Sequence, residues 1–294
     1  EMSGQLWKNL CKCFFPHTVK KCQRKQKKNQ HQHQHQQMKT KKVKECNLEK
    51  IIVGGYDECN QLGENSNNFD DDDSPIISPP VNLSFDVSSL LSYSTYGSHS
   101  VLVINDGSLK GVGYNKDGRI SSTLQKTCKK FTNFSINDSN GNQLAAVSAV
   151  CYQSGTLYIL SKSSNNERQL VLCDCDIKGG EPVFLDIGNH QPVSLFGGNY
   201  RVAAIGSEGE IFLINRETVV LSPNSPIEAY SLPDGEKASS VACCDDRIFV
   251  LSLNGRVFTS PITSNKALKF SPVPELSGQE IVCVSGTFNH CLAV

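Results

Sequence analysis

The sequence predicts an all-β protein, and its internal repeats indicate a β-propeller. Three segments share one pattern: an apolar β-like run, a polar residue followed by Gly, and a second β-like run. They are residues 100–113, 201–214 and 247–260, with candidate turns at Asp106-Gly107, Glu208-Gly209 and Asn254-Gly255. Asp-Gly and Asn-Gly between two such runs are strong signals of a β-hairpin with a type I′ turn. We therefore predict three hairpins at these positions.

The spacing of the hairpins gives the period of the repeat. Gly209 and Gly255 are 46 residues apart, and Gly107 and Gly209 are 102 apart, which is about two such steps. Residues 155–174 supply the intermediate hairpin, with "KSSNN" in place of a tight turn. A period of about 40–55 residues with several strands in each unit is typical of a β-propeller. We expect about five consecutive antiparallel units in residues 49–294, around a common axis.

The start of the chain has a different composition from the rest. Residues 1–50 hold 13 Lys and Arg against 3 Asp and Glu, whereas residues 51–294 hold 16 against 26. The low-complexity segment 1–48 has too few apolar residues to form a core, so we predict a disordered basic tail followed by an acidic domain. Met38 is a candidate for the true start, because the domain pattern begins near Glu49.

The cysteines and the hydropathy pattern indicate an intracellular protein. The 13 cysteines are odd in number and scattered through apolar β-like runs, which is typical of buried thiols in a reducing compartment. The first 20 residues lack the apolar core of a signal peptide, and no run reaches the roughly 18 apolar residues of a membrane span. We expect a cytoplasmic or nuclear location and no contact with a membrane.

Motifs of catalysis, metal binding and cofactor binding are missing from the sequence. It has no Gly-x-Ser-x-Gly elbow and no phosphate loop. The Cys and His residues of the tail follow no common zinc spacing. His290 and Cys291 are neighbours on a predicted strand, so their side chains point to opposite faces and do not form a catalytic pair. We predict no enzymatic activity, no cofactor and no metal site.

Two short motifs resemble a known repeat family. Residues 54–64, "GGYDECNQLGE", are similar to the Gly-x-Asn-x-x-Gly-Gln-Leu-Gly signature of the regulator of chromosome condensation family, and residues 111–120 are a weaker copy. Residues 96–103 and 285–294 match the His-containing run that opens the next hairpin in that family, whereas Tyr200 or Arg201 stands where a third His is expected. The resemblance identifies a structural framework in Gly55, Gly63, His99, Gly107, Gly113, Gly209, Gly255, Gly286 and His290.

The resemblance implies a seven-bladed propeller, of which residues 49–294 supply about five blades. We therefore expect a ring truncated at its C-terminus, with natural sequence continuing past Val294. The family mostly serves as a platform for protein partners, and its founding member exchanges nucleotide on the small GTPase Ran. The sequence thus favours a non-catalytic intracellular scaffold, with an exchange factor or regulator of a small Ran-like GTPase as the alternative. The acidic domain argues against nucleic-acid binding by the propeller itself.

Overall fold

The computed structural model describes ten stretches of the chain. They are residues 51–56, 77–83, 89–161, 167–175, 177, 181–199, 201–215, 225–263, 267–287 and 290–294. These stretches form 20 β-strands and a few single-turn 3₁₀ segments, and they contain no α-helix. The all-β prediction is confirmed. The predicted tail, Met38, Gly63 and the "KSSNN" turn beyond Ser161 lie outside the described residues.

Four antiparallel sheets of four strands each make up most of the fold, and in each sheet the strands are adjacent in chain order. Blade 1 consists of β3 (Leu90–Tyr96), β4 (His99–Ile104), β5 (Leu109–Tyr114) and β6 (Thr127–Phe134). Blade 2 consists of β7 (Ala145–Tyr152), β8 (Gly155–Ser161), β9 (Arg168–Asp174) and β10 (Val183–Leu185). Blade 3 consists of β11 (Pro192–Gly197), β12 (Arg201–Gly206), β13 (Ile211–Asn215) and β14 (Ala229–Tyr230). Blade 4 consists of β15 (Ala238–Cys243), β16 (Arg247–Ser252), β17 (Val257–Pro261) and β18 (Ser271–Pro272).

Two further sheets have two strands each. One pairs β1 (Ile51–Tyr56) with β2 (Ile77–Leu83), and the other pairs β19 (Val284–Thr287) with β20 (His290–Ala293). β19 and β20 have the place and the tight hairpin of a first and second strand, so they begin a fifth unit after the four complete blades. β1 ends in Gly55-Tyr56 as β5 ends in Gly113-Tyr114, which places the two copies of the sequence motif at the ends of equivalent strands.

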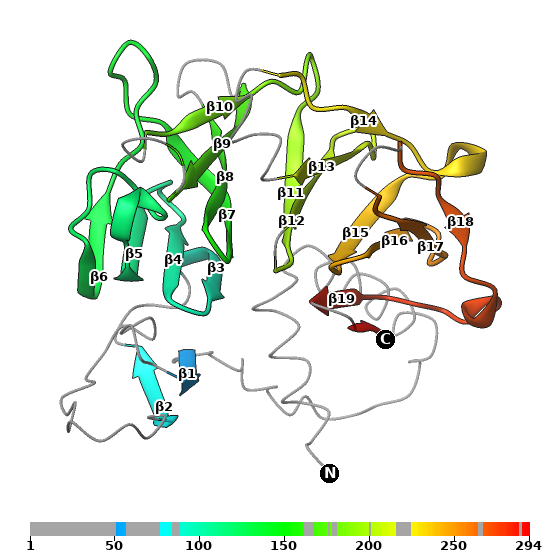
Figure 1. Cartoon of the computed structure of the whole chain (residues 1–294), viewed down its shortest axis with the longest axis horizontal. Helices are drawn as coiled ribbons and strands as arrows, with labels where there is room; N and C mark the ends of the chain where they lie inside the picture. Colours follow the sequence, from blue (N-terminus) through cyan, green and yellow to red (C-terminus); the bar gives the residue numbers. More distant parts are fainter. Residues whose placement is uncertain are drawn as a thin grey trace, which may run out of the picture.

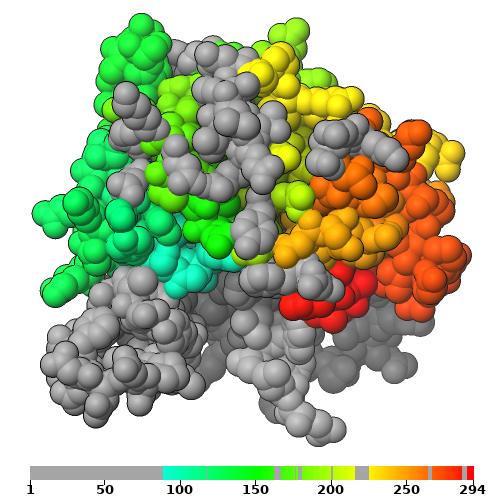
Figure 2. Space-filling model, viewed as in Figure 1, coloured from blue at the N-terminus to red at the C-terminus, as the bar shows by residue number. Residues whose placement is uncertain are grey.

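The blades follow one another around a common centre. The first strand of each blade lies on the inside of the arc, and the fourth strands β6, β10, β14 and β18 lie on the outside (Figure 1). Figure 2 shows the blades in chain order around the molecule, from the cyan and green blade 1 to the orange blade 4 with β19–β20 in red beside it. This arrangement confirms the predicted propeller architecture.

Each hydrophobic core lies between two consecutive sheets. On β8, Tyr158 and Leu160 pack toward blade 1, whereas Leu157 and Ile159 pack toward blade 3. This alternation follows from the two-residue period of a strand, and it explains why the central residues of the second strands are mostly apolar on both faces. Blades 3 and 4 share a third core, and a fourth lies between blade 4 and β19–β20. A blade is therefore stable only when neighbouring blades cover both of its faces.

The three predicted hairpins are present, but their turns differ from the prediction. The N–H of Gly107 donates to Ile104 at 2.9 Å, that of Gly209 to Gly206 at 3.0 Å, and that of Gly255 to Ser252 at 3.1 Å. The glycines have φ of 82°, 87° and 82°, whereas the residue before each of them does not have positive φ. A type I′ turn requires positive φ at two successive residues, so the predicted type I′ turns are wrong. These are three-residue loops with Gly in the left-handed position.

The alternating strand direction gives each blade two ends. The turns between second and third strands and the connections between blades lie at one end. The hairpins between first and second strands and the loops between third and fourth strands lie at the other. We call the first end the acidic face, because its described turns and connections are rich in Asp and Glu, and the second end the hairpin face.

Candidate functional site

On the hairpin face, polar side chains join each blade to the next. His99, the first residue of β4, is fully buried, and its Nε2 lies 3.1 Å from the carbonyl oxygen of Gly155 and 3.2 Å from Thr156 Oγ1 in blade 2. Burial lowers the pKa of His99 to about 3, so the imidazole is neutral and its Nε2–H donates to the carbonyl. The residue holds two blades together, which is the structural role that the sequence motif indicates.

Blade 3 makes the same connection with a different side chain. Arg201, the first residue of β12, occupies the position of His99 and donates from its guanidinium to the carbonyl oxygen of Asp245 in blade 4. Arg119 likewise donates to the carbonyl oxygen of Gln153 at 3.5 Å, and the N–H of Gln153 donates to the carbonyl oxygen of Asn199 at 3.2 Å. Polar contacts therefore link the first hairpins of successive blades, and Arg201 replaces the expected His in this role.

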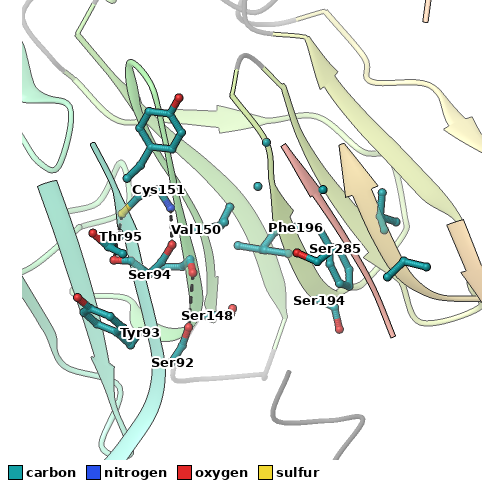
Figure 3. Close-up of a pocket in the computed structure, with 18 of the residues that line it drawn as sticks. Ser92, Tyr93, Ser94, Thr95, Ser148, Val150, Cys151, Ser194, Phe196 and Ser285 are labelled. Carbon is teal, nitrogen blue, oxygen red and sulfur yellow. Dashed lines mark hydrogen bonds between the residues drawn. The ribbon is translucent and has the colours of Figure 1, made fainter. Parts of the chain in front are cut away.

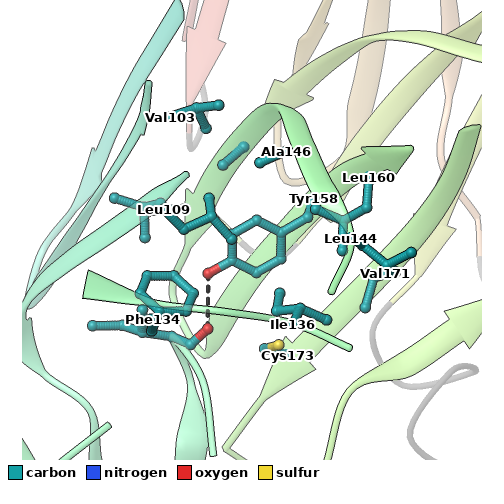
Figure 4. Close-up of a cluster of buried hydrophobic side chains, with 14 residues drawn as sticks. Val103, Leu109, Phe134, Ile136, Leu144, Ala146, Tyr158, Leu160, Val171 and Cys173 are labelled. Atoms are coloured by element: carbon teal, nitrogen blue, oxygen red, sulfur yellow. Dashed lines mark hydrogen bonds between the residues drawn. The ribbon is translucent and has the colours of Figure 1, made fainter. Parts of the chain in front are cut away.

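The second copy of the signature organises the loop after β5. Asn115 is 2% exposed; its Oδ1 accepts from the N–H of Ile120 at 2.8 Å, and its Nδ2 donates to the carbonyl oxygen of Ser121 at 2.9 Å. These bonds hold Ile120 in the core, where the hydroxyl of Tyr158 from blade 2 donates to its carbonyl oxygen at 2.7 Å (Figure 4). The Asn of the motif thus joins blades 1 and 2, a role that the sequence analysis did not assign to it.

The predicted framework glycines occupy several kinds of position. Gly107, Gly209 and Gly255 form the turns described above, and Gly113 ends β5 with φ of 96°. A Cβ on Gly209 would lie 2.8 Å from the Cα of Lys237, so this turn packs closely against the connection to blade 4. Gly55 pairs with Ser78, and Gly286 pairs with Cys291. Their functional roles remain predictions.

The second predicted framework histidine has a different environment from the first. His290 begins β20 as His99 begins β4, yet its side chain is exposed. Its neighbour Cys291 is partly buried and packs against the core between blade 4 and β19–β20. Burial raises the pKa of the Cys291 thiol to about 11, which keeps it protonated and poorly nucleophilic. The two side chains therefore lie on opposite faces of the strand, as predicted.

A channel runs along the centre of the arc, lined by the first strands. It has a cavity volume of about 640 Å³ and receives residues from β3, β7, β11, β15, β19 and β20. Figure 3 shows Ser92, Ser148, Ser194 and Ser285 around it, together with the ring of Phe196. Asp, Glu, Lys and Arg are all missing from its described lining. The channel is therefore polar through hydroxyl groups rather than through charge.

Four of these strands share a β-bulge followed by a serine. The register shifts immediately before Ser92 in β3, Ser148 in β7, Ser194 in β11 and Ser240 in β15. Each serine stands seven residues before the first residue of the following strand, namely His99, Gly155, Arg201 and Arg247. This regularity is present in the sequence, but it becomes apparent only when the hairpins are aligned, and the sequence analysis missed it.

The two faces of the propeller differ in charge. The described turns and connections of the acidic face carry two basic residues, Lys237 and Arg256, against ten acidic residues: Asp106, Asp138, Glu167, Asp186, Glu208, Glu210, Asp234, Glu236, Glu275 and Glu280. The described loops of the hairpin face carry four basic residues, Lys116, Arg119, Lys126 and Lys269, against five acidic residues: Asp117, Glu181, Glu228, Asp245 and Asp246. Among the described turns and loops, the negative charge is therefore concentrated on one face.

Several pairs on the acidic face moderate this charge locally. Glu208 pairs with Lys237 at 2.7 Å and Glu236 with Arg256 at 2.9 Å. Glu210 lies 2.7 Å from His190 Nδ1, and the pKa of its carboxyl is lowered. The acidic residues outnumber the basic ones so strongly that these pairs leave the face negative at neutral pH.

The described residues lack both a metal-binding cluster and a membrane-spanning helix. Those residues contain no group of three or more His, Cys, Asp or Glu side chains placed to hold a metal ion. Among them there is also no helix with the length and apolar character needed to cross a bilayer.

Comparison with known proteins gives matches to solved structures. No protein-family model and no curated protein matches the sequence. The crystal structure of human WBSCR16 matches with a TM-score of 0.59 and 13% identity, over 83% of this chain and 67% of that one. The crystal structure of Prp20p from Saccharomyces cerevisiae, the yeast RCC1, matches with a TM-score of 0.54 and 10% identity, over 83% of this chain and 64% of that one.

The chain thus spans about two thirds of the length of these two solved chains. At sequence identities this low, the similarity to these structures shows the fold alone. The structural matches agree with the arrangement of the four blades. The chain has the β-propeller fold of the regulator of chromosome condensation (RCC1) type.

Proposed function

We propose that this chain is a non-catalytic, intracellular protein-binding propeller, and that its acidic face receives a basic surface of a partner protein. The observation that supports this proposal is the concentration of ten acidic residues on one face, against a nearly balanced opposite face. Seven of these ten side chains are exposed on turns and connections, where loops commonly carry binding residues: Asp106, Glu167, Asp186, Glu208, Asp234, Glu275 and Glu280. A field of one sign attracts partners of the opposite sign and speeds their association.

The similarity of fold to Prp20p suggests a first binding partner with which to test this proposal. The solved structure of Prp20p is described together with its binding properties to Gsp1p and histones. Histones are rich in Lys and Arg, so purified core histones serve as a basic protein probe for the full chain. We expect binding that weakens as salt concentration rises, because the attraction acts between exposed charges.

A pair of variants with equal charge change tests which face binds. The acidic-face variant combines Asp234→Asn, Glu275→Gln and Glu280→Gln. The hairpin-face variant combines Glu181→Gln, Glu228→Gln and Asp246→Asn. Each variant removes three exposed carboxylates, so any difference in histone binding reports the location of the charge and not its total amount. Equal binding by both variants would contradict the assignment of the acidic face.

The alternative function is regulation of a small Ran-like GTPase. The shared fold with Prp20p favours this alternative, because the binding of Prp20p to Gsp1p has been described. Capture of a GTPase in its nucleotide-free and nucleotide-loaded forms discriminates between the two functions. An exchange factor retains the nucleotide-free form preferentially, whereas a scaffold binds both forms equally or neither. Faster release of bound nucleotide in the presence of the chain would establish the alternative and overturn the non-catalytic assignment.

A further inference from the structure

We propose that the axial channel is a binding site for a small uncharged ligand that carries an amide group on an apolar or aromatic frame. The channel has a volume of about 640 Å³, within the range of about 300–1,000 Å³ that is usual for ligand sites in proteins. Such sites typically combine apolar walls with a few convergent polar groups. The lining of this channel has that composition, and the proposed role of the acidic face does not involve it.

Hydroxyl groups supply the convergent polar groups. Ser148, Ser194 and Ser285 come from three different blades and line the same cavity. Their side chains are accessible and form no hydrogen bond within the part of the chain that the structure describes. A serine hydroxyl both donates and accepts, so it can pair with either the N–H or the carbonyl oxygen of an amide.

β-Bulges precede two of these three serines, Ser148 and Ser194. A bulge places one extra residue in a strand and changes the direction of the following side chain. The bulges before Ser148 and Ser194 are matched by one before Ser92, whose hydroxyl donates to the carbonyl oxygen of Ala149 at 3.4 Å. The same bulge recurs in blade 4, where Ser240 is buried and is not part of the channel lining. Ser92 bonds to the neighbouring blade, whereas Ser148 and Ser194 leave their hydroxyls to the channel.

A buried donor without an acceptor in the described residues belongs to Asn199, which follows the lining residue Gly198. Asn199 is 2% exposed, and its Oδ1 accepts a hydrogen bond from the hydroxyl of Tyr96, a residue of the channel lining. Its Nδ2 is buried and has no hydrogen-bond partner among the residues that the structure describes. A buried donor that lacks an acceptor destabilises the folded state, and a ligand carbonyl beside Gly198 and Tyr96 would satisfy it.

The remaining lining determines the charge and shape of the ligand. Phe196, Val150 and Tyr93 supply aromatic and apolar surface, and the described lining contains no Asp, Glu, Lys or Arg. Apart from His290, whose side chain is exposed, the lining gives an ion no oppositely charged group, so its loss of hydration would be costly. The channel therefore selects against ions and favours a neutral ligand whose apolar part packs against these side chains.

Three probes of nearly equal size test this selectivity on the full chain. Benzamide is neutral, benzoate is an anion and benzylammonium is a cation at neutral pH, while all three carry the same ring. Saturation-transfer NMR titrations give their dissociation constants. We expect benzamide to bind, and both charged probes to bind at least about tenfold more weakly.

Three variants locate the binding. Ser148→Ala combined with Ser194→Ala is expected to weaken benzamide binding several-fold, and Ser194→Trp is expected to abolish it by filling the channel. Ser207→Ala, on an exposed turn outside the channel, is the matched control and leaves binding unchanged. Circular dichroism verifies that each variant is folded; if Ser194→Trp is not, the double alanine variant decides the outcome. Failure of benzamide to bind, equal binding of the three probes, or full binding by the double variant would overturn the proposal.

Discussion

The two faces of the propeller use their polar residues in different ways. On the hairpin face, His99, Arg119 and Arg201 are directed at backbone carbonyls of the next blade, so these side chains hold the ring together. On the acidic face, the backbone of the turns makes the corresponding contacts, such as the N–H of Ala146 donating to the carbonyl oxygen of Gly107 at 2.8 Å. On the acidic face the blades are therefore joined mainly by backbone, and exposed carboxylates lie on the turns, whereas the charged side chains of the hairpin face largely serve the fold.

This difference predicts opposite effects of substitutions on the two faces. Changes to the bridging residues of the hairpin face should reduce stability. Changes to the exposed carboxylates of the acidic face should alter binding and leave stability nearly constant. The largest effect is expected where a bridging side chain is completely buried.

Replacing His99 with Ala is expected to have the largest effect. The substitution leaves a cavity between two blades and removes the hydrogen bond to the carbonyl oxygen of Gly155, which remains buried. We expect a loss of about 3–4 kcal/mol in the free energy of unfolding, measured by urea denaturation. Ser207→Ala is the control on an exposed turn, with an expected change within about 0.5 kcal/mol. A loss below about 1 kcal/mol for His99→Ala would contradict the bridging role.

The same histidine predicts a dependence of stability on pH. Burial lowers the pKa of His99 to about 3, below its ordinary value of 6.5, so the unfolded chain binds a proton that the folded chain does not. Stability is therefore complete above pH 6.5 and decreases as pH falls toward 3. Between pH 6.5 and 4.5 this one group contributes a loss of about 2–3 kcal/mol.

The variant His99→Gln isolates this contribution from the other titrating groups. Its free energy of unfolding should change less over the same pH range, by the amount that His99 contributes in the parent chain. Denaturation curves at several pH values give the comparison. Parallel pH profiles of the two proteins would show that His99 is not a neutral buried side chain.

Substitutions at two turn glycines of the acidic face are expected to reduce stability by an intermediate amount. A Cβ at Gly209 would lie 2.8 Å from the backbone of Lys237, whereas a Cβ at Gly255 would lie 3.4 Å from its nearest neighbour, the carbonyl oxygen of Ile281. Both have positive φ, so each Ala substitution carries a conformational cost of about 1–2 kcal/mol. We expect Gly209→Ala to cost about 1–2 kcal/mol more than Gly255→Ala, measured by thermal denaturation. Equal costs would mean that the contact with Lys237 relaxes freely.

Arg201 is expected to contribute less than His99, although the two occupy equivalent positions. Arg201 is only partly buried, whereas His99 is fully buried. Arg201→Met keeps the apolar stem and removes the donor to Asp245, so we expect a loss of about 1 kcal/mol in the free energy of unfolding. Arg247→Met, at the same position in blade 4, is the matched control, because its guanidinium contacts Thr259 within its own blade at 3.5 Å. A larger loss for Arg247→Met would contradict the role of Arg201 between blades.

The sequence predicted the architecture better than it predicted the contacts. The spacing of the turn glycines located the blades, because Gly is needed wherever the backbone has positive φ. The spacing did not predict the turn type, because a Gly with positive φ occurs in both two-residue and three-residue loops. The role of Arg201 was not predictable from the motif, because it depends on how far a longer side chain reaches into the next blade. The serines of the channel were missed because their repetition follows the bulges, and bulges cannot be recognised before strand pairing is known.

The most direct test of the account compares histone binding and stability in the two matched charge variants. For the acidic-face variant (Asp234→Asn, Glu275→Gln and Glu280→Gln), we predict binding about tenfold weaker than that of the parent chain and a melting temperature that does not change. For the hairpin-face variant (Glu181→Gln, Glu228→Gln and Asp246→Asn), we predict binding within about twofold of the parent chain. Equal weakening in both variants would show that the total charge alone governs binding, and stronger weakening in the hairpin-face variant would place the partner on the opposite face.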